Sequence, residues 1–161
     1  MSELFPALKR IKQALSKEEC SALLTKETRG VLSLIGTNGY PYAFPINHYY
    51  DASENALYFH CGKIGYKLDC LEKNPRACFT VTEHGERKDG EWWLTAGSAI
   101  AFGTVEILSD SAKITDISRK LSAKFTNDEA YVEEEIEKYL PSTICLRFQI
   151  EHISGKRVKE K

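Results

Sequence analysis

Three strands joined by two turns can be read in residues 30–61, GVLSLIGTNGYPYAFPINHYYDASENALYFHC. The first run alternates, and the Asn38-Gly39 pair that follows it is the strongest short-range signal for a β-hairpin. The second run carries Pro41 and Pro45, which suit an edge strand because proline cannot donate a ladder hydrogen bond. The turn DASEN then leads into the third run, ALYFHC. Strands joined in this way predict an antiparallel sheet.

Outside this stretch the sequence gives further helix and strand signals. Ser16 and Glu19 form the S-x-x-E pattern of a capping box, which predicts a helix over 17–27. The remaining elements that we expect are a helix over 64–73, a strand over 77–82, a long glycine-broken β segment over 92–108, helices over 111–125 and 128–140, and a last strand over 143–153. We therefore predict a mainly β fold, a predominantly antiparallel β-barrel with flanking helices, as a single domain over 1–161.

Composition and charge exclude several classes of protein. Hydrophobic residues make up 42% of the 161 residues and charged residues 28%, which is ordinary for a globular protein. The net charge of −1 gives no field that would attract nucleic acid. No apolar run is long enough to span a membrane. The five cysteines show no CxxC pair, and no signal peptide is visible, so we expect reduced thiols and a cytoplasmic location.

The stretch His60–Lys67, HCGKIGYK, joins the third strand to the next helix. If that helix begins near Lys63, its free N–H groups carry partial positive charge, and Lys63 and Lys67 lie on one face. Gly62 and Gly65 would let a ligand approach the backbone. These features suit a phosphate. The alternative is an ordinary solvent-facing first turn, and the residues alone leave both readings open.

His60 and Cys61 are neighbours at the end of a strand, so their side chains are expected to point to opposite faces. They are therefore not expected to act together as a catalytic pair or as joint metal ligands. His60 is either a strand-end histidine with an ordinary partner or a group that positions a substrate or donates a proton beside a cofactor. We predict no metal site, because the histidines show no ligand spacing.

Three other segments can be interpreted as ordinary structural elements. The run PINHYY (45–50) could place Asn47 and His48 along a flat heteroaromatic ligand, but it also reads as a plain edge strand. Trp92 and Trp93 are expected in the core or at a dimer interface, with a ligand wall as the alternative. The run DEAYVEEEIEKY (128–139) reads as a solvated helix face with i,i+4 charge pairs.

Residues 29–81 resemble the flavin-binding split-barrel family related to pyridoxamine 5′-phosphate oxidase, within the branch of the 5-nitroimidazole resistance proteins. The resemblance rests on the hairpin with G-x-P, the P-[IV]-N strand, the YFH-x-G-x-x-G-x-K turn, the NPRACF strand and a weaker S-x-x-x-x-G match at Ser98–Gly103. It implies an FMN-binding split barrel that forms a homodimer, with the flavin (FMN, or FAD through the same mononucleotide moiety) in a cleft between two barrels.

The resemblance also implies roles for individual residues. Ile46, Asn47 and His48 would run along the isoalloxazine edge. The ribityl phosphate would be held by the turn after the third strand, whose residues are Cys61, Gly62, Lys63, Gly65 and Lys67. His60 would lie beside the flavin and take part in the chemistry. Ser98 stands where the oxidase branch often has a ligand-contacting glutamine.

The implied activity is flavin-dependent reduction of a small molecule such as a nitroaromatic. The C-terminal run FQIEHISGKRVKEK does not match the arginine-rich signature of the oxidase branch, so pyridoxamine 5′-phosphate oxidation is the weaker expectation. A non-catalytic module that stores flavin, or that holds haem through His48, His60 or His152, is the main alternative. Neither nucleic acid nor a membrane is expected as a partner.

Overall fold

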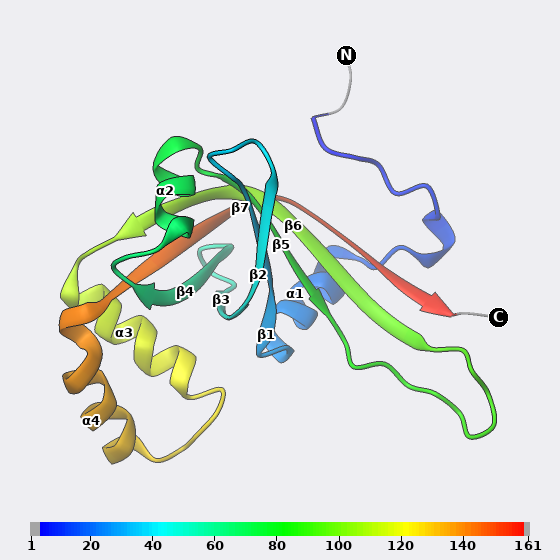
Figure 1. Ribbon diagram of the computed structural model, residues 1–161. Helices are drawn as coiled ribbons and strands as arrows, with labels where there is room; N and C mark the ends of the chain where they lie inside the picture. Colours follow the sequence, from blue (N-terminus) through cyan, green and yellow to red (C-terminus); the bar gives the residue numbers. More distant parts are fainter. Residues whose placement is uncertain (1–3, 160–161) are drawn as a thin grey trace.

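The computed structural model describes residues 4–159, and its core is one curled antiparallel sheet (Figure 1). The seven strands are β1 (Arg29–Ile35), β2 (Pro41–Asn47), β3 (Tyr49–Asp51), β4 (Ala56–Gly62), β5 (Arg76–Thr82), β6 (Thr95–Leu108) and β7 (Thr143–Lys159). Their order across the sheet is β2-β1-β5-β6-β7-β4-β3, and every neighbouring pair is antiparallel. The sheet curls so that β2 and β4 approach each other, which makes a half-barrel of the split-barrel type and confirms the predicted fold class.

Four α-helices flank the described sheet. They are α1 (Lys17–Lys26), α2 (Tyr66–Lys73), α3 (Ser111–Ser122) and α4 (Glu129–Tyr139), with short 3-10 turns η1 (Ile11–Gln13) and η2 (Leu140–Ser142). The capping box predicted for α1 is present: the Ser16 side chain accepts a hydrogen bond from the Glu19 backbone at 3.1 Å, and the Glu19 carboxylate accepts from the Ser16 backbone at 2.7 Å. The predicted helix boundary at Ser16 is therefore confirmed.

The hairpin predicted at Asn38-Gly39 joins β1 and β2. Gly39 has a φ of 85°, a left-handed conformation that glycine adopts without steric cost. The proline-containing strand β2 lies at one edge of the sheet, as predicted. It ends at Asn47, and β3 begins only at Tyr49, so the second run forms two strands that are separated by His48.

Strands β6 and β7 pair along almost their whole length and continue beyond the barrel as a long two-stranded arm (Figure 1). The glycine-broken segment over 92–108 is thus one strand, with a bulge between Phe102 and Gly103. A Cβ on Gly103 would lie 1.9 Å from the backbone oxygen of Gln149, so the crossing of the two strands requires a glycine there.

Two apolar clusters hold the barrel and its helices together. The larger fills the inside of the curl, and fully buried aromatic residues at its centre include Phe59, Phe79 and Phe148. The smaller lies on the outer side of β4 and β7, where α3 packs against them; its buried members are Ala56, Tyr58, Ile114, Ile117 and Cys145. Strand β4 therefore has buried side chains on both faces.

Candidate functional site

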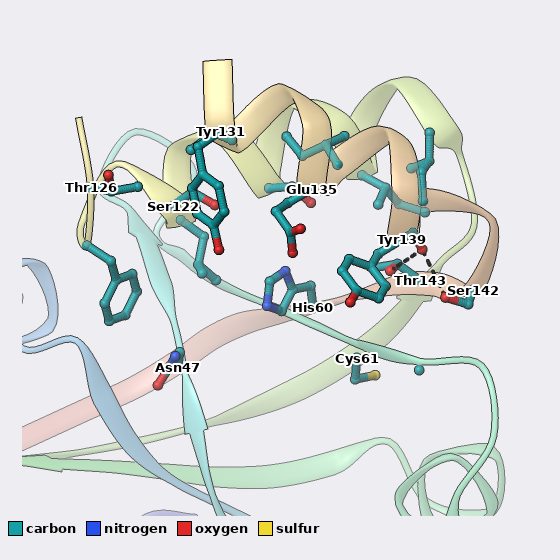
Figure 2. Close-up of a pocket in the computed structure, with 18 residues that line it drawn as sticks. Asn47, His60, Cys61, Ser122, Thr126, Tyr131, Glu135, Tyr139, Ser142 and Thr143 are labelled. Carbon is teal, nitrogen blue, oxygen red and sulfur yellow. Dashed lines mark hydrogen bonds between the residues drawn. The ribbon is translucent and has the colours of Figure 1, made fainter. Parts of the chain in front are cut away.

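A groove of about 520 Å³ opens where the end of β4 faces α3 and α4 (Figure 2). We call it the His60 groove. Apolar side chains from the two helices, among them Leu121, Val132 and Ile136, form much of its lining. Its size lies within the usual range of about 300–1,000 Å³ for small-molecule sites, and an apolar lining with a few polar groups is also typical of them.

The alternation of β4 places His60 in this groove. Tyr58 belongs to the cluster under α3, whereas Phe59 belongs to the barrel interior. His60 therefore faces the helices, and Cys61 packs toward the barrel interior. Figure 2 shows the two side chains pointing in opposite directions. The prediction that these neighbouring side chains point to opposite faces is confirmed.

The His60 ring is reached from solvent through the open groove, but the surrounding walls remove much of its hydration. This desolvation lowers the pKa of His60 below its ordinary value of 6.5. The ring is therefore mostly neutral at pH 7. One ring nitrogen can donate a hydrogen bond and the other can accept one.

Helix α4 supplies a row of polar side chains to the same groove. Tyr131, Glu135 and Tyr139 are spaced four residues apart and so share one helix face. Figure 2 shows Glu135 pointing toward His60 from the opposite wall. The predicted solvated helix has no fully buried residue, and this face of it also forms a wall of the groove. The i, i+4, i+8 spacing of the two tyrosines and the glutamate is the sequence signal that could have predicted this shared face.

The helix that follows the turn after β4 begins later than predicted. The helix begins at Tyr66, not near Lys63, because Gly65 is the N-cap with a φ of 141°. Lys63 and Lys67 therefore do not share a helix face. Ile64, at the start of the predicted helix over 64–73, lies outside α2 and is 90% exposed.

The two lysines of this turn have different surroundings. The Lys63 ammonium donates a hydrogen bond to the backbone oxygen of Pro141 in η2. Lys67 folds back over the turn, and its Nζ lies 3.4 Å from the position that a Cβ on Gly65 would occupy. Its charge also lowers the pKa of Cys61, although desolvation outweighs this effect and raises that pKa overall. Lys67 thus lies beside both Gly65 and Cys61.

The backbone of the turn is accessible from outside. No atom lies within 4 Å of the position that a Cβ on Gly62 would occupy. No side chain of the described residues caps the N-terminus of α2. Backbone N–H groups at such a helix start attract anions, and Lys67 adds a positive charge.

The three predicted residues at the end of β2 and directly after it lie in three different environments. Asn47 lines the His60 groove, and its Oδ1 accepts a hydrogen bond of 2.9 Å from the Arg29 guanidinium. Ile46 is half-buried against the barrel core. His48 is fully buried, with Nε2 at 2.8 Å from the backbone oxygen of Leu24. Its side chain is therefore not presented to the groove.

Two further predicted positions lie away from the groove. Ser98 is on β6, paired with Thr82 and Lys156, far along the sheet from the end of β4. His152 is stacked on Phe5, with ring centroids 4.9 Å apart. Among the described residues, no group of three or more His, Cys, Asp or Glu side chains could hold a metal ion.

Taken together, Asn47, His60, Cys61 and Gly62 line one groove, and Gly62 is also the last residue of β4 before the turn that leads to Lys67. A family model described as pyridoxamine 5′-phosphate oxidase matches residues 16–157. The chain belongs to this family. No curated protein matches the chain. No described helix is both long and apolar enough to cross a membrane.

Solved structures show the same fold. A candidate 5-nitroimidazole antibiotic resistance protein from Bacteroides thetaiotaomicron has a TM-score of 0.75 and 17% identity, covering 92% of this chain and 90% of that chain. The FAD and haem binding protein from Mycobacterium smegmatis has a TM-score of 0.71 and 24% identity, covering 93% and 74%. A flavocytochrome from Azotobacter vinelandii has a TM-score of 0.76 and 20% identity, covering 96% and 75%. At these identities the similarity establishes the fold alone.

Proposed function

We propose that the protein binds a flavin through its mononucleotide moiety, with the ring system in the His60 groove and the phosphate at the β4–α2 turn. The observation that carries this proposal is that the groove and the β4–α2 turn adjoin at the end of β4. Cys61 and Gly62 line the groove and are the last residues of β4, directly before the turn that carries Lys67, so we place one extended ligand across the end of β4, with its ring in the groove and its phosphate at the turn. The family supports the choice of flavin, since the names of its structural neighbours include FAD-binding proteins.

The phosphate end of the site fits a dianion. The backbone at Gly62 is open, and the start of α2 is not capped by a side chain of the described residues. Lys67 lies beside this backbone, whereas the ammonium of Lys63 is bonded to Pro141. Lys67 is therefore the main charge partner for the phosphate, and the N–H groups at the helix start supply the remaining donors.

The ring end of the site fits a flat apolar ligand. The groove offers apolar walls from α3 and α4, with His60 and Asn47 as polar contacts on the strand side. A bound flavin supplies the redox chemistry, while the protein binds and orients it. Because the lowered pKa leaves His60 mostly neutral at pH 7, we assign it the role of hydrogen-bonding and orienting a substrate.

The reaction that we propose is flavin-dependent reduction of a small molecule, such as a nitroaromatic, and FMN is the proposed form of the cofactor. The lining of the groove favours a compact, largely apolar substrate. Its polar atoms would reach His60 and the tyrosines of α4. Pyridoxamine 5′-phosphate is less suited, because the C-terminal segment lacks the arginine-rich signature expected for that substrate.

We also propose that the protein is a homodimer that pairs through the outer face of the sheet. Val31, Ile35 and Ile100 are exposed apolar residues on β1 and β6. Val31 and Ile100 both lie opposite Thr80 of β5, so they share one face of the sheet. An apolar face of this kind is typical of protein interfaces.

Haem binding is the second candidate, because His60 is an accessible imidazole in an apolar groove. The visible spectrum of the purified or reconstituted protein separates the two, since bound flavin and haem have distinct absorption bands. We expect FMN to bind and riboflavin, which lacks the phosphate, to bind more weakly. If neither co-purified nor added flavin binds, the proposal is wrong.

Catalysis is tested on the flavin-loaded protein. The reduced protein is mixed with nitroaromatics without oxygen, and the return of the oxidised flavin spectrum is followed. Reoxidation faster than that of free reduced FMN is expected of a reductase. The same rate as free FMN favours a non-catalytic flavin-binding module.

A further inference from the structure

The hydrogen bond between Arg29 and Asn47 fixes the direction of an amide in the His60 groove. The two residues are direct partners across β1 and β2, and the Arg29 Nη1 atom lies 2.9 Å from Asn47 Oδ1. A guanidinium group has only donors. The Asn47 amide oxygen must therefore face Arg29, and its nitrogen must turn the other way.

The freed nitrogen lies on the groove side. In Figure 2 the oxygen of Asn47 points away from the groove, and the nitrogen is on the side of His60. Among the described residues, no hydrogen bond engages this Nδ2 atom. Asn47 therefore presents two N–H donors and no acceptor to whatever occupies the groove.

The opposite wall carries a carboxylate among its hydroxyl groups. Glu135, on α4, is the one carboxylate among the described residues that line the groove, and it points toward His60. Its counter-ion, Lys138, lies at 3.4 Å on the exposed side of the helix. A ring with acceptor oxygens is disfavoured next to a carboxylate and favoured next to Asn47. The side chain of Asn47 thus offers only donors on the strand side, and the Glu135 carboxylate offers only acceptors on the helix side.

We propose that Arg29 is a positioning residue: it holds the Asn47 amide so that the groove selects a ring ligand with an acceptor oxygen at that end. This rests on the proposed function, in which the ligand is a flavin. The exocyclic carbonyl oxygens on the pyrimidine edge of a flavin are such acceptors. A donor at this edge also stabilises negative charge that the ring gains on reduction.

Asn47→Asp separates this role from a purely structural one. The variant keeps a partner for Arg29, now as an ion pair, but it removes both N–H donors and places a carboxylate at the ring edge. We expect unchanged or higher thermal stability of the protein without flavin, together with FMN affinity about tenfold lower. If the pair only joins the ends of β1 and β2, Asn47→Asp binds FMN as the wild type does, and the proposal is overturned.

Arg29 itself is tested by rescue. Arg29→Met frees the amide to rotate and is expected to lower FMN affinity several-fold, whereas Arg29→Lys, which is also a donor only, restores most of it. Arg87→Met is the matched control, since Arg87 is an exposed arginine in the loop between β5 and β6. Equal affinities for Arg29→Met and Arg87→Met would contradict the proposal.

The side-chain amide of Asn47 gives a direct readout by NMR. In ¹⁵N-labelled protein, its N–H₂ resonances are expected to shift on addition of FMN, and Arg29→Met is expected to reduce that shift. Unmoved resonances in a protein that binds FMN would overturn this inference and leave the flavin proposal intact. Failure of the wild type to bind FMN by any measurement would overturn both.

Discussion

The ammonium group of Lys63 donates a hydrogen bond to the backbone oxygen of Pro141, 78 residues later in the chain. This bond ties the β4–α2 turn to η2, the segment that follows α4. Leu140 and Ser142, the neighbours of Pro141, line the His60 groove. The turn proposed for the phosphate is thus linked to the far wall of the groove. Of the two lysines of this turn, Lys63 is bonded to η2 and Lys67 is not.

The first prediction separates the two lysines. Lys67→Ala is expected to weaken FMN binding by roughly 1.5–3 kcal/mol, the range for a hydrogen bond to a charged group, which is about 10- to 150-fold in Kd. Lys67→Arg should retain most of the affinity. The measurement is equilibrium titration with FMN and with riboflavin.

Lys63→Ala is the matched comparison. It is expected to change FMN affinity less than Lys67→Ala does, and to reduce the protection of the η2 backbone from hydrogen exchange, because the link to Pro141 is lost. An equal loss of FMN affinity in both variants would show that Lys63 exchanges Pro141 for the phosphate.

The second prediction concerns Gly62. Gly62→Ala should leave the free energy of unfolding within about 0.5 kcal/mol of the wild type, since nothing lies within 4 Å of the added Cβ. It should lower FMN affinity about tenfold, because the methyl group crowds the backbone that the phosphate approaches. Urea unfolding and FMN titration measure the two effects. Wild-type affinity would place the phosphate elsewhere.

Gly103→Ala provides the contrasting case in the same barrel. Its Cβ would lie 1.9 Å from the Gln149 backbone oxygen, so β6 and β7 would have to separate at the bulge. Overpacking of this kind is expected to destabilise the fold by about 2 kcal/mol or more. A variant as stable as Gly62→Ala would show that the bulge relaxes without cost.

The third prediction is a pH dependence of stability caused by His48. Burial, with a further contribution from the charge of Lys124, lowers the pKa of His48 from 6.5 to about 4. Between these two values the unfolded chain binds more protons than the folded one, so the free energy of unfolding falls as the pH falls. The loss from His48 reaches roughly 3 kcal/mol by pH 4 and is absent above about pH 7.

His48→Gln removes the titrating ring and should flatten this part of the profile. His84→Gln, at an exposed histidine, should leave it unchanged. The comparison is made by urea unfolding across the acidic range, so that the titration of carboxylates is common to all three proteins. Parallel profiles for wild type and His48→Gln would contradict the assignment.

The fourth prediction tests the homodimer. Val31→Glu places a charge on the exposed apolar face of the sheet, and a charge that is buried without a partner disfavours association. Sedimentation is expected to show a dimer for the wild type and a monomer for Val31→Glu. Ile11→Glu, at an exposed residue of η1, should remain dimeric. A monomeric wild type would remove the proposed interface.

Local features of the chain were predictable because their causes are local. The capping box of Ser16 and Glu19, the Asn38-Gly39 hairpin, and the opposite directions of His60 and Cys61 depend on neighbouring residues and on strand geometry alone. The family resemblance in residues 29–81 also indicated the fold, because it rests on the order of these same elements.

Tertiary contacts were not predictable in this way. The position of His48 depends on the Leu24 carbonyl of α1, and the role of Lys63 depends on Pro141 near the other end of the chain. The start of α2 was misplaced because the φ of 141° at Gly65 is not encoded in a charge or capping pattern. The many charged residues of α4 predicted only a solvent-exposed helix. The face whose tyrosines and Glu135 line the groove was therefore missed from the sequence.

The two walls of the His60 groove differ in how much the fold depends on their side chains. Strand β4 carries four consecutive buried residues, Ala56–Phe59, directly before His60, so most substitutions there would damage the barrel. Helix α4 has no fully buried residue. Substitutions along α4 therefore alter the shape and polarity of the groove at little expense to folding. The ligand preference of the groove is therefore open to redesign through this one surface helix, while the buried residues before His60 hold its imidazole in place.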